Sequence, residues 1–128
     1  MNFAVDKHQK YVVLKLEESN FTDDHNADLK SQLISLNAEG FHNMVLDLSA
    51  VKEINDSQDL SSLQTGKKLC KKAKGLFIIT GINNTIKEIL KISNLNKSLN
   101  IVGKLEEAAD LIFMEELEKE LLGGVEKD

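Results

Sequence analysis

Along the chain, hydrophobic and polar positions repeat with two different periods. Around Leu14, apolar side chains occupy alternate positions, which is the period of a half-buried strand. Further on, Leu29, Leu33 and Leu36 recur at intervals of four and three residues, which is the period of one face of a helix. Gly40 follows as a natural helix stop. The first third of the chain is therefore predicted to pass from strands into a helix.

The rest of the chain keeps alternating between the two patterns. The expected strands cover 2–7, 11–17, 44–48, 76–79 and 99–102, and the expected helices begin near Thr22, Asp56, Thr85 and Lys104. Strands separated by helices require crossover connections, so the sheet is at least partly parallel and is covered by helices. We predict one α/β domain over 1–122, with a mixed, mostly parallel sheet packed with about four α-helices, and a short flexible tail over 123–128.

Short local signals mark the helix ends. Thr22, or one of the two aspartates that follow it, can cap the first helix. Thr85-x-x-Glu88 has the form of a capping box. Gly66 costs roughly 1 kcal/mol against alanine inside the second helix, so we expect a close packing contact at that position.

The last predicted helix, about 104–122, carries a broad apolar stripe opposite a row of acidic residues. The stripe is expected to belong to the core, and the acidic side to face solvent or, alternatively, a partner. Gly123-Gly124 is predicted to end the helix. The stripe consists of Leu105, Ala108, Ala109, Ile112, Phe113, Leu117 and Leu121.

The composition is that of an ordinary single-domain protein, with 128 residues, 41% hydrophobic and 29% charged. A net charge of -5 and the absence of arginine argue against direct nucleic-acid binding, which needs clustered cations. The single cysteine, Cys70, fits a reducing compartment. We see no signal-peptide segment and no apolar run of the roughly 20 residues that a membrane span needs. A cytoplasmic protein without membrane insertion is expected.

Residues that could carry catalysis or hold a metal are sparse. His8, His25 and His42 share no ligand-like spacing and Cys70 stands alone, so no metal or other cofactor is expected. No nucleophile-elbow motif surrounds a serine. The chain is therefore expected to be a binding protein rather than an enzyme, with no catalytic residues.

The basic residues gather in one cluster, Lys67, Lys68, Lys71, Lys72 and Lys74. These lysines either meet an acidic partner or serve as favourable cations at the C-terminus of the second helix.

One stretch, 43–69, joins a buried strand to a helix start that carries a carboxylate and a hydroxyl. Met44-Val45-Leu46 opens it, and after a short polar turn the helix-like pattern begins at Asp56-Ser57. A hydroxyl at a helix start is well placed for a phosphoryl group, because the free backbone N–H groups and the positive end of the dipole stabilise negative charge there.

The order of elements and several local patterns resemble the STAS domain, the fold of bacterial anti-sigma factor antagonists. The resemblance runs from about Phe3 to Leu117. It is most specific where Val45-Leu46-Asp47-Leu48-Ser49-Ala50-Val51 is followed by Ile54-Asn55-Asp56-Ser57. Lys91-Ile92-Ser93-Asn94-Leu95 resembles the end of the family's third helix, and Leu105-Glu106-Glu107-Ala108 resembles the start of its last one.

The resemblance implies a signal-transduction protein that regulates transcription. In the family, an Asp-Ser-Ser-Gly-Leu motif opens the helix, and the serine or threonine after the aspartate is phosphorylated by a partner anti-sigma kinase. The unphosphorylated form binds that partner and releases the sigma factor. This chain has Asp56-Ser57-Gln58-Asp59-Leu60, so Ser57 is the candidate phosphorylation site.

Gln58 and Asp59 depart from the family motif, and three interpretations stay open. Ser57 is a phosphoswitch; or Asp56 and Asp59 only cap the helix and serve its dipole; or the Asp59 carboxylate permanently mimics the phosphorylated charge. Asp59 also places bulk and negative charge where the family favours glycine, which hinders the approach of a kinase.

The expected partner is an anti-sigma factor or serine kinase-like protein, bound by a monomer or weak homodimer of this chain. The contact surface would combine the helix start with the turns at 19–24 and 81–85. Its candidate residues are Asp23, Asp56, Ser57, Gln58, Asp59, Ser61 and Asn83. The alternative is a STAS subunit of a transporter or another signalling complex that works without phosphorylation.

Overall fold

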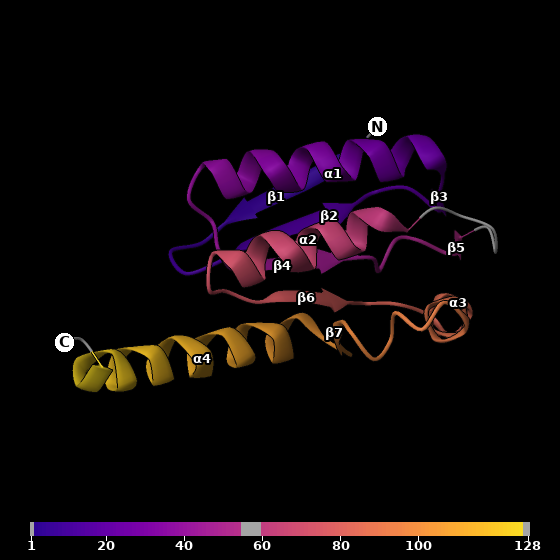
Figure 1. Cartoon of the computed structure of the whole chain (residues 1–128). Helices are drawn as coiled ribbons and strands as arrows, with labels where there is room; N and C mark the ends of the chain where they lie inside the picture. Colours follow the sequence, from indigo (N-terminus) through magenta and orange to yellow (C-terminus); the bar gives the residue numbers. More distant parts are fainter. Residues whose placement is uncertain (1, 55–59, 127–128) are drawn as a thin grey trace.

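The computed structural model describes residues 2–54 and 60–126. Its strands and helices alternate along the chain, as the hydrophobic pattern predicts (Figure 1). In chain order they are β1 (Phe3–Lys7), β2 (Val12–Leu16), β3 (Asn20–Phe21), α1 (Asp23–Ala38), β4 (Met44–Asp47), β5 (Glu53–Ile54), α2 (Ser61–Lys72), β6 (Phe77–Thr80), α3 (Asn84–Ile92), β7 (Asn100–Val102) and α4 (Leu105–Glu126).

Five of the strands form one mixed sheet in the order β1-β2-β4-β6-β7. The hairpin pair β1–β2 is antiparallel, whereas β2–β4, β4–β6 and β6–β7 are parallel. The predicted α/β fold with a mostly parallel sheet and four helices is therefore confirmed. The pairing of β3 with β5 is an addition that the sequence did not reveal, because a two-residue strand is too short to show a period.

The first face of the sheet holds the large core. In register, Leu14, Leu46 and Ile79 lie next to one another on this face. Helices α1 and α2 run side by side over them, and Leu29 and Leu33 of α1 are fully buried (Figure 1). The predicted leucine stripe of the first helix is therefore a core stripe.

The second face is covered by α4 with a much smaller core. Because side chains alternate along a strand, Val13, Val45 and Ile78 point away from α1 and α2. They pack against Ala108 and Ile112 of α4. Only the beginning of α4 therefore contributes to the apolar core.

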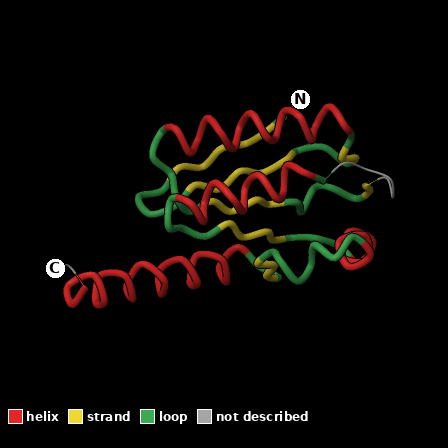
Figure 2. Tube along the Cα trace, in the orientation of Figure 1, coloured by secondary structure: helices red, strands yellow, loops and turns green. Residues whose placement is uncertain are grey.

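The core stripe predicted for the last helix is wrong at its first residue, Leu105, which is 38% exposed, and in its second half. Phe113, Leu117 and Leu121 are exposed, although Ala108 and Ile112 are buried as predicted. The exposure in the second half has a physical reason: the C-terminal half of α4 extends past the ends of the strands (Figure 2). No sheet lies opposite that half, so Leu117 and Leu121 have no strand to pack on, and Phe113, at the transition, meets the Tyr11 ring edge-on.

Two helix ends differ from the prediction. Helix α3 is capped by Asn83, whose side-chain oxygen accepts a hydrogen bond from the Ile86 N–H at 2.9 Å, so the capping box predicted at Thr85 and Glu88 is not formed. Asparagine is among the best N-caps, which explains the earlier start. Helix α4 continues to Glu126 rather than ending at Leu122, because glycine weakens a helix by about 1 kcal/mol without forbidding it.

Two other local predictions are confirmed. Thr22 caps α1, since its hydroxyl accepts a hydrogen bond from the His25 N–H, and His25 returns a bond to the Thr22 backbone. Gly66 makes the expected close contact, because a Cβ at that position would lie 2.5 Å from the Phe77 ring. Within the described residues, no helix combines the length and the apolar character that a membrane crossing requires.

Candidate partner-binding site

The described residues that flank the predicted site lie at the edge where the parallel strands end. Strands β2, β4 and β6 finish at Leu16, Asp47 and Thr80, and parallel strands bring their carboxyl ends to the same edge. Asp56, Ser57, Gln58 and Asp59 lie outside the described residues, between β5 and α2. The described part of the site is what surrounds that segment on both sides.

The segment before it is joined to the 19–24 turn. The backbone N–H groups of Lys52 and Glu53 both donate to the Ser19 carbonyl, at 2.7 and 3.1 Å. The short parallel pair β3–β5 continues this contact and buries Phe21 and Ile54. The 19–24 turn and the approach to the predicted helix start are therefore one surface.

Asn83 connects the 81–85 turn to the same segment. While its side-chain oxygen caps α3, its amide group donates to the Lys52 carbonyl at 3.0 Å. One exposed side chain thus fixes the start of α3 relative to residues 52–54. The turns at 19–24 and 81–85, both predicted to contact the partner, are therefore each hydrogen-bonded to the Lys52 backbone.

The segment after the predicted motif is held by Asn26, a residue that the sequence analysis missed. Its side-chain oxygen accepts from the Ser62 N–H at 3.1 Å, and its amide donates to the Ser61 hydroxyl at 3.4 Å. Leu60, the N-cap of α2, gives no side-chain cap, so buried Asn26 takes that role from a neighbouring helix. The sequence holds one indication of this role: Asn26 is a polar residue on the leucine stripe, three positions before Leu29.

Asp23 and Ser61 flank this contact on the two helices. Asp23 is exposed in the first turn of α1, where a carboxylate suits the helix dipole. Ser61 is half-buried at the first position of α2. Because Asn26 joins the two helix starts, Asp23 and Ser61 belong to neighbouring parts of the surface.

Gly81 allows the loops after β4 and β6 to approach closely. Its φ of +79° lies in the left-handed region, and a Cβ there would come within 2.9 Å of Ser49. The Leu48 N–H donates to the Thr80 carbonyl at 2.9 Å, which connects the same two loops. These two loops are therefore packed so closely that no side chain is tolerated at Gly81.

The described residues offer little for catalysis or metal binding. They contain no group of three or more histidine, cysteine, aspartate or glutamate side chains placed to hold a metal ion. Burial raises the pKa of the Cys70 thiol to about 12, so it stays protonated and is a poor nucleophile. What the described part of the site offers is hydrogen-bonding groups on a rigid surface.

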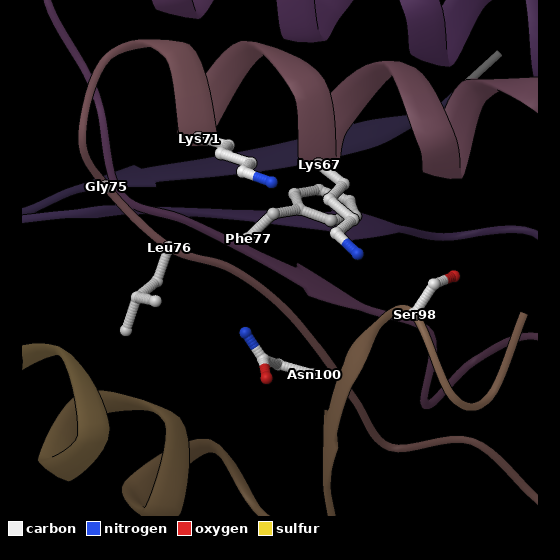
Figure 3. A pocket seen from close by; sticks show the side chains of 7 residues that line it. All are labelled: Lys67, Lys71, Gly75, Leu76, Phe77, Ser98 and Asn100. Atoms are coloured by element: carbon white, nitrogen blue, oxygen red, sulfur yellow. The ribbon is translucent and has the colours of Figure 1, made fainter.

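The lysine cluster lies elsewhere, at the amino end of β6. Lys67 and Lys71 lie beside the Phe77 ring at a cavity of about 200 Å³ (Figure 3). Its other lining residues are Gly75, Leu76, Ser98 and Asn100. The cavity and the predicted partner surface are separate features of the molecule.

This arrangement, with a mixed five-stranded sheet and a helix start held between two turns, is that of a STAS domain. The family model of the STAS domain matches residues 2–108, and the chain belongs to that family. No curated protein sequence matches the chain.

Solved structures with this fold include anti-sigma factor antagonists. A candidate anti-sigma factor antagonist from Thermotoga maritima has a TM-score of 0.73 at 22% identity, covering 86% of this chain and 93% of its own. The anti-sigma factor antagonist SpoIIAA of Bacillus, in its unphosphorylated form, has a TM-score of 0.72 at 12% identity, covering 87% and 96%. SLC26A9 has a TM-score of 0.61 at 14% identity, covering 91% of this chain but 22% of that longer one. At these identities the likeness establishes the fold.

Proposed function

We propose that the protein is a non-catalytic regulatory module of the anti-sigma factor antagonist type, acting in the cytoplasm. It binds an anti-sigma factor or serine kinase-like protein through the α2-start surface, which we define as Asp23, Asp56, Ser57, Gln58, Asp59, Ser61 and Asn83. The observation that carries the proposal is the convergence of Ser19, Asn26 and Asn83 on both sides of the 55–59 segment. Three separate parts of the chain are thereby hydrogen-bonded to described residues that come just before or just after this short motif in the sequence.

Phosphorylation of Ser57 is the proposed control. A phosphoryl group adds about -1.5 to -2 charges at pH 7, enough to disrupt a docked protein surface. SpoIIAA, which shares this fold, is known in an unphosphorylated and a phosphorylated form, which supports the same control here. Asp59 is the residue that would weaken it, by adding a fixed negative charge two positions away.

The first experiment identifies the partner and the state of Ser57 together. The chain is co-purified from its native cell, and mass spectrometry reports both the bound protein and any phosphate. The purified partner is then incubated with labelled ATP and each variant. We expect incorporation into the wild type and into Ser31→Ala, whose serine lies exposed on α1, but none into Ser57→Ala.

The second experiment separates the three interpretations of the motif by calorimetry with the same partner. For a phosphoswitch, Ser57→Glu weakens binding about tenfold or more, which is roughly 1.4 kcal/mol. If the wild type takes no phosphate and Asp59→Gly newly accepts it, Ser57 is a degenerate site that Asp59 withholds from the kinase. A change in affinity of about tenfold on Asp59→Gly, without phosphate on either protein, marks the Asp59 carboxylate as the permanent mimic of the phosphorylated charge. Phosphate on neither protein, with unchanged affinity, leaves Asp56 and Asp59 as helix caps.

The alternative function is a STAS subunit of a transporter or another complex without phosphorylation. It is favoured by the match to SLC26A9, in which the fold covers a fifth of a much longer chain. Ser57→Ala and Ser57→Glu variants that both keep full affinity for the co-purified partner would support this alternative.

A further inference from the structure

The exposed side of α4 carries a continuous row of large apolar side chains. We define the α4 ridge as Phe113, Met114, Leu117 and Leu121, whose exposed fractions lie between 52% and 66%. Residues three, four and seven positions apart lie on one side of a helix, so these four form a single strip. Isolated exposed leucines are ordinary, but a strip of this kind marks an interaction surface.

The ridge is held in a fixed orientation by polar contacts on the opposite side of the helix. The Glu116 carboxylate accepts hydrogen bonds from Lys119 at 3.0 Å and from buried Asn43 at 3.3 Å, and lies 3.2 Å from the His42 ring nitrogen. Lys119 also donates to the Lys74 carbonyl. The inner side of α4 is thereby fastened to the loops before β4 and β6, and the ridge is a preorganised surface.

The edge of the ridge continues onto the β1–β2 hairpin. The Tyr11 ring meets the Phe113 ring edge-on, with centroids 6.2 Å apart. On the other side, a cavity of about 270 Å³ opens beside the ridge residue Met114. The cavity is lined by Leu76, Asn100, Leu111, Met114, Glu115 and Glu118.

The charges around the ridge define the chemistry of what binds it. Apart from Lys119, every charged residue between Leu105 and Leu122 is acidic, and Lys119 points inward to Glu116 and Lys74. The cavity combines apolar walls with the carboxylates of Glu115 and Glu118. This combination fits a lysine or arginine side chain, whose apolar stem packs while its cationic end meets the acids.

A second copy of this chain does not fit the same surface. Two α4 helices packed ridge to ridge would bring acidic flanks together in either orientation, and the neighbouring cation Lys10 already lies 3.6 Å from Glu120 of its own chain. A partner helix with an apolar stripe and basic flanks satisfies both the ridge and the acids.

We propose that the α4 ridge and its acidic cavity form a second docking surface, which binds a basic amphipathic helix of a partner protein. The ridge spans roughly 12 Å, so it contacts about two turns of that helix. It lies outside residues 2–108, which the STAS family model matches, and at the far end of the molecule from α3 and from the described start of α2, which belong to the α2-start surface (Figure 1). Both surfaces are therefore open to occupation at the same time.

The test uses 18-residue peptides of leucine and lysine, labelled for fluorescence anisotropy. One peptide places leucine at helical spacing, and a second has the same composition in scrambled order. We expect the wild type to bind the amphipathic peptide at least about tenfold more tightly than the scrambled one. Equal affinity for the two peptides overturns the proposal, because charge alone would then explain binding.

Variants assign the binding to the surface. Leu117→Gln/Leu121→Gln and Glu115→Gln/Glu118→Gln are each expected to raise the Kd about tenfold. The matched control is Ile34→Gln/Ile92→Gln, which removes two comparably exposed apolar side chains elsewhere and leaves the Kd within about twofold. Circular dichroism confirms that each variant is folded. Unchanged peptide affinity in both ridge variants overturns the proposal.

Light scattering tests whether a second copy of this chain occupies the ridge instead. The wild type is expected to stay monomeric at about 100 µM, roughly the highest protein concentration of the anisotropy titration. A dimer that dissociates in Leu117→Gln/Leu121→Gln would assign the ridge to a second copy of the chain and overturn the proposal. None of these measurements involves Ser57, so they stand or fall independently of the proposed function.

Discussion

The two faces of the central sheet are covered in different ways. On the first face, α1 and α2 press a wide layer of apolar side chains against the strands. On the second face, α4 contributes the buried side chains Ala108 and Ile112, and its next turn is fastened through Glu116. Packing therefore holds the first face, whereas the second depends on a small apolar contact and one polar cluster.

The helices α1 and α4 show what this difference means for a sequence pattern. Both carry apolar residues at helical spacing, yet Leu33 of α1 is fully buried whereas Leu117 of α4 is 55% exposed. The stripe determines which side of a helix avoids water, but the reach of the sheet decides whether anything covers it. An apolar stripe beyond the end of the strands is a surface for another molecule.

The largest effect should come from the first face. Leu33→Ala leaves a cavity in the close-packed layer between α1 and the sheet, and is expected to lower the free energy of unfolding by about 2–5 kcal/mol. Denaturation with guanidinium chloride measures this loss in the free energy of unfolding. Ile34→Ala is the matched control, because that side chain is exposed on the same helix and should change stability by less than about 0.5 kcal/mol. Equal losses in the two variants would contradict the buried role of α1.

The second effect tests how closely α2 approaches the sheet. Gly66→Ala gains about 1 kcal/mol of helix propensity but places a methyl group 2.5 Å from the buried Phe77 ring. Overpacking of this kind costs about 1–3 kcal/mol, so a net loss of about 1–2 kcal/mol is expected. In a Phe77→Leu background the same substitution should cost less, which a double-mutant cycle measures. A stabilising Gly66→Ala would mean that the helix lies farther from the sheet.

The third effect tests the polar fastening of the second face. Partial burial acts to raise the pKa of Glu116, but hydrogen bonds from Lys119, Asn43 and His42 outweigh it and lower the pKa from 4.5 to about 2. A lowered folded-state pKa contributes stability that is complete above pH 4.5 and is lost as the pH falls towards 2. Glu116→Gln should therefore cost about 1 kcal/mol at pH 6 and almost nothing at pH 2.

Urea denaturation at the two pH values measures this prediction, with Glu118→Gln as the control on the exposed side of α4. The control is expected to differ little from the wild type at either pH. A Glu116→Gln cost that stays constant between pH 6 and pH 2 would show that the carboxylate is not stabilised by its neighbours.

The sequence predicts the fold well because its long elements have strong periods. The five sheet strands and four helices follow from those periods, and the family follows from the residues around Asp56 and Ser57. Short features escaped, because β3 and β5 have two residues each and no pattern can form over that length. The prediction for Ser57 itself concerns a residue outside the described part of the chain.

The surroundings of the candidate site could be predicted only in part. The turns at 19–24 and 81–85 were expected near the α2 start, and hydrogen bonds join both of them to residues 52 and 53, which precede it in the chain. Asn26 was missed because its role is a contact between helices 35 residues apart in sequence, which no local pattern encodes. A polar residue on an otherwise apolar stripe is the one local indication of such a role.

The smallest effect is expected on the ridge of α4. Leu117→Ala removes a side chain that packs on little of the protein, so the free energy of unfolding should change by less than about 0.5 kcal/mol. Ile112→Ala, five residues earlier on the same helix, removes a fully buried side chain and should cost several times more. Thermal unfolding of both variants at two protein concentrations checks the contrast. A large loss for Leu117→Ala that grows with protein concentration would mean that another copy covers the ridge, since only an associated state gains stability by mass action.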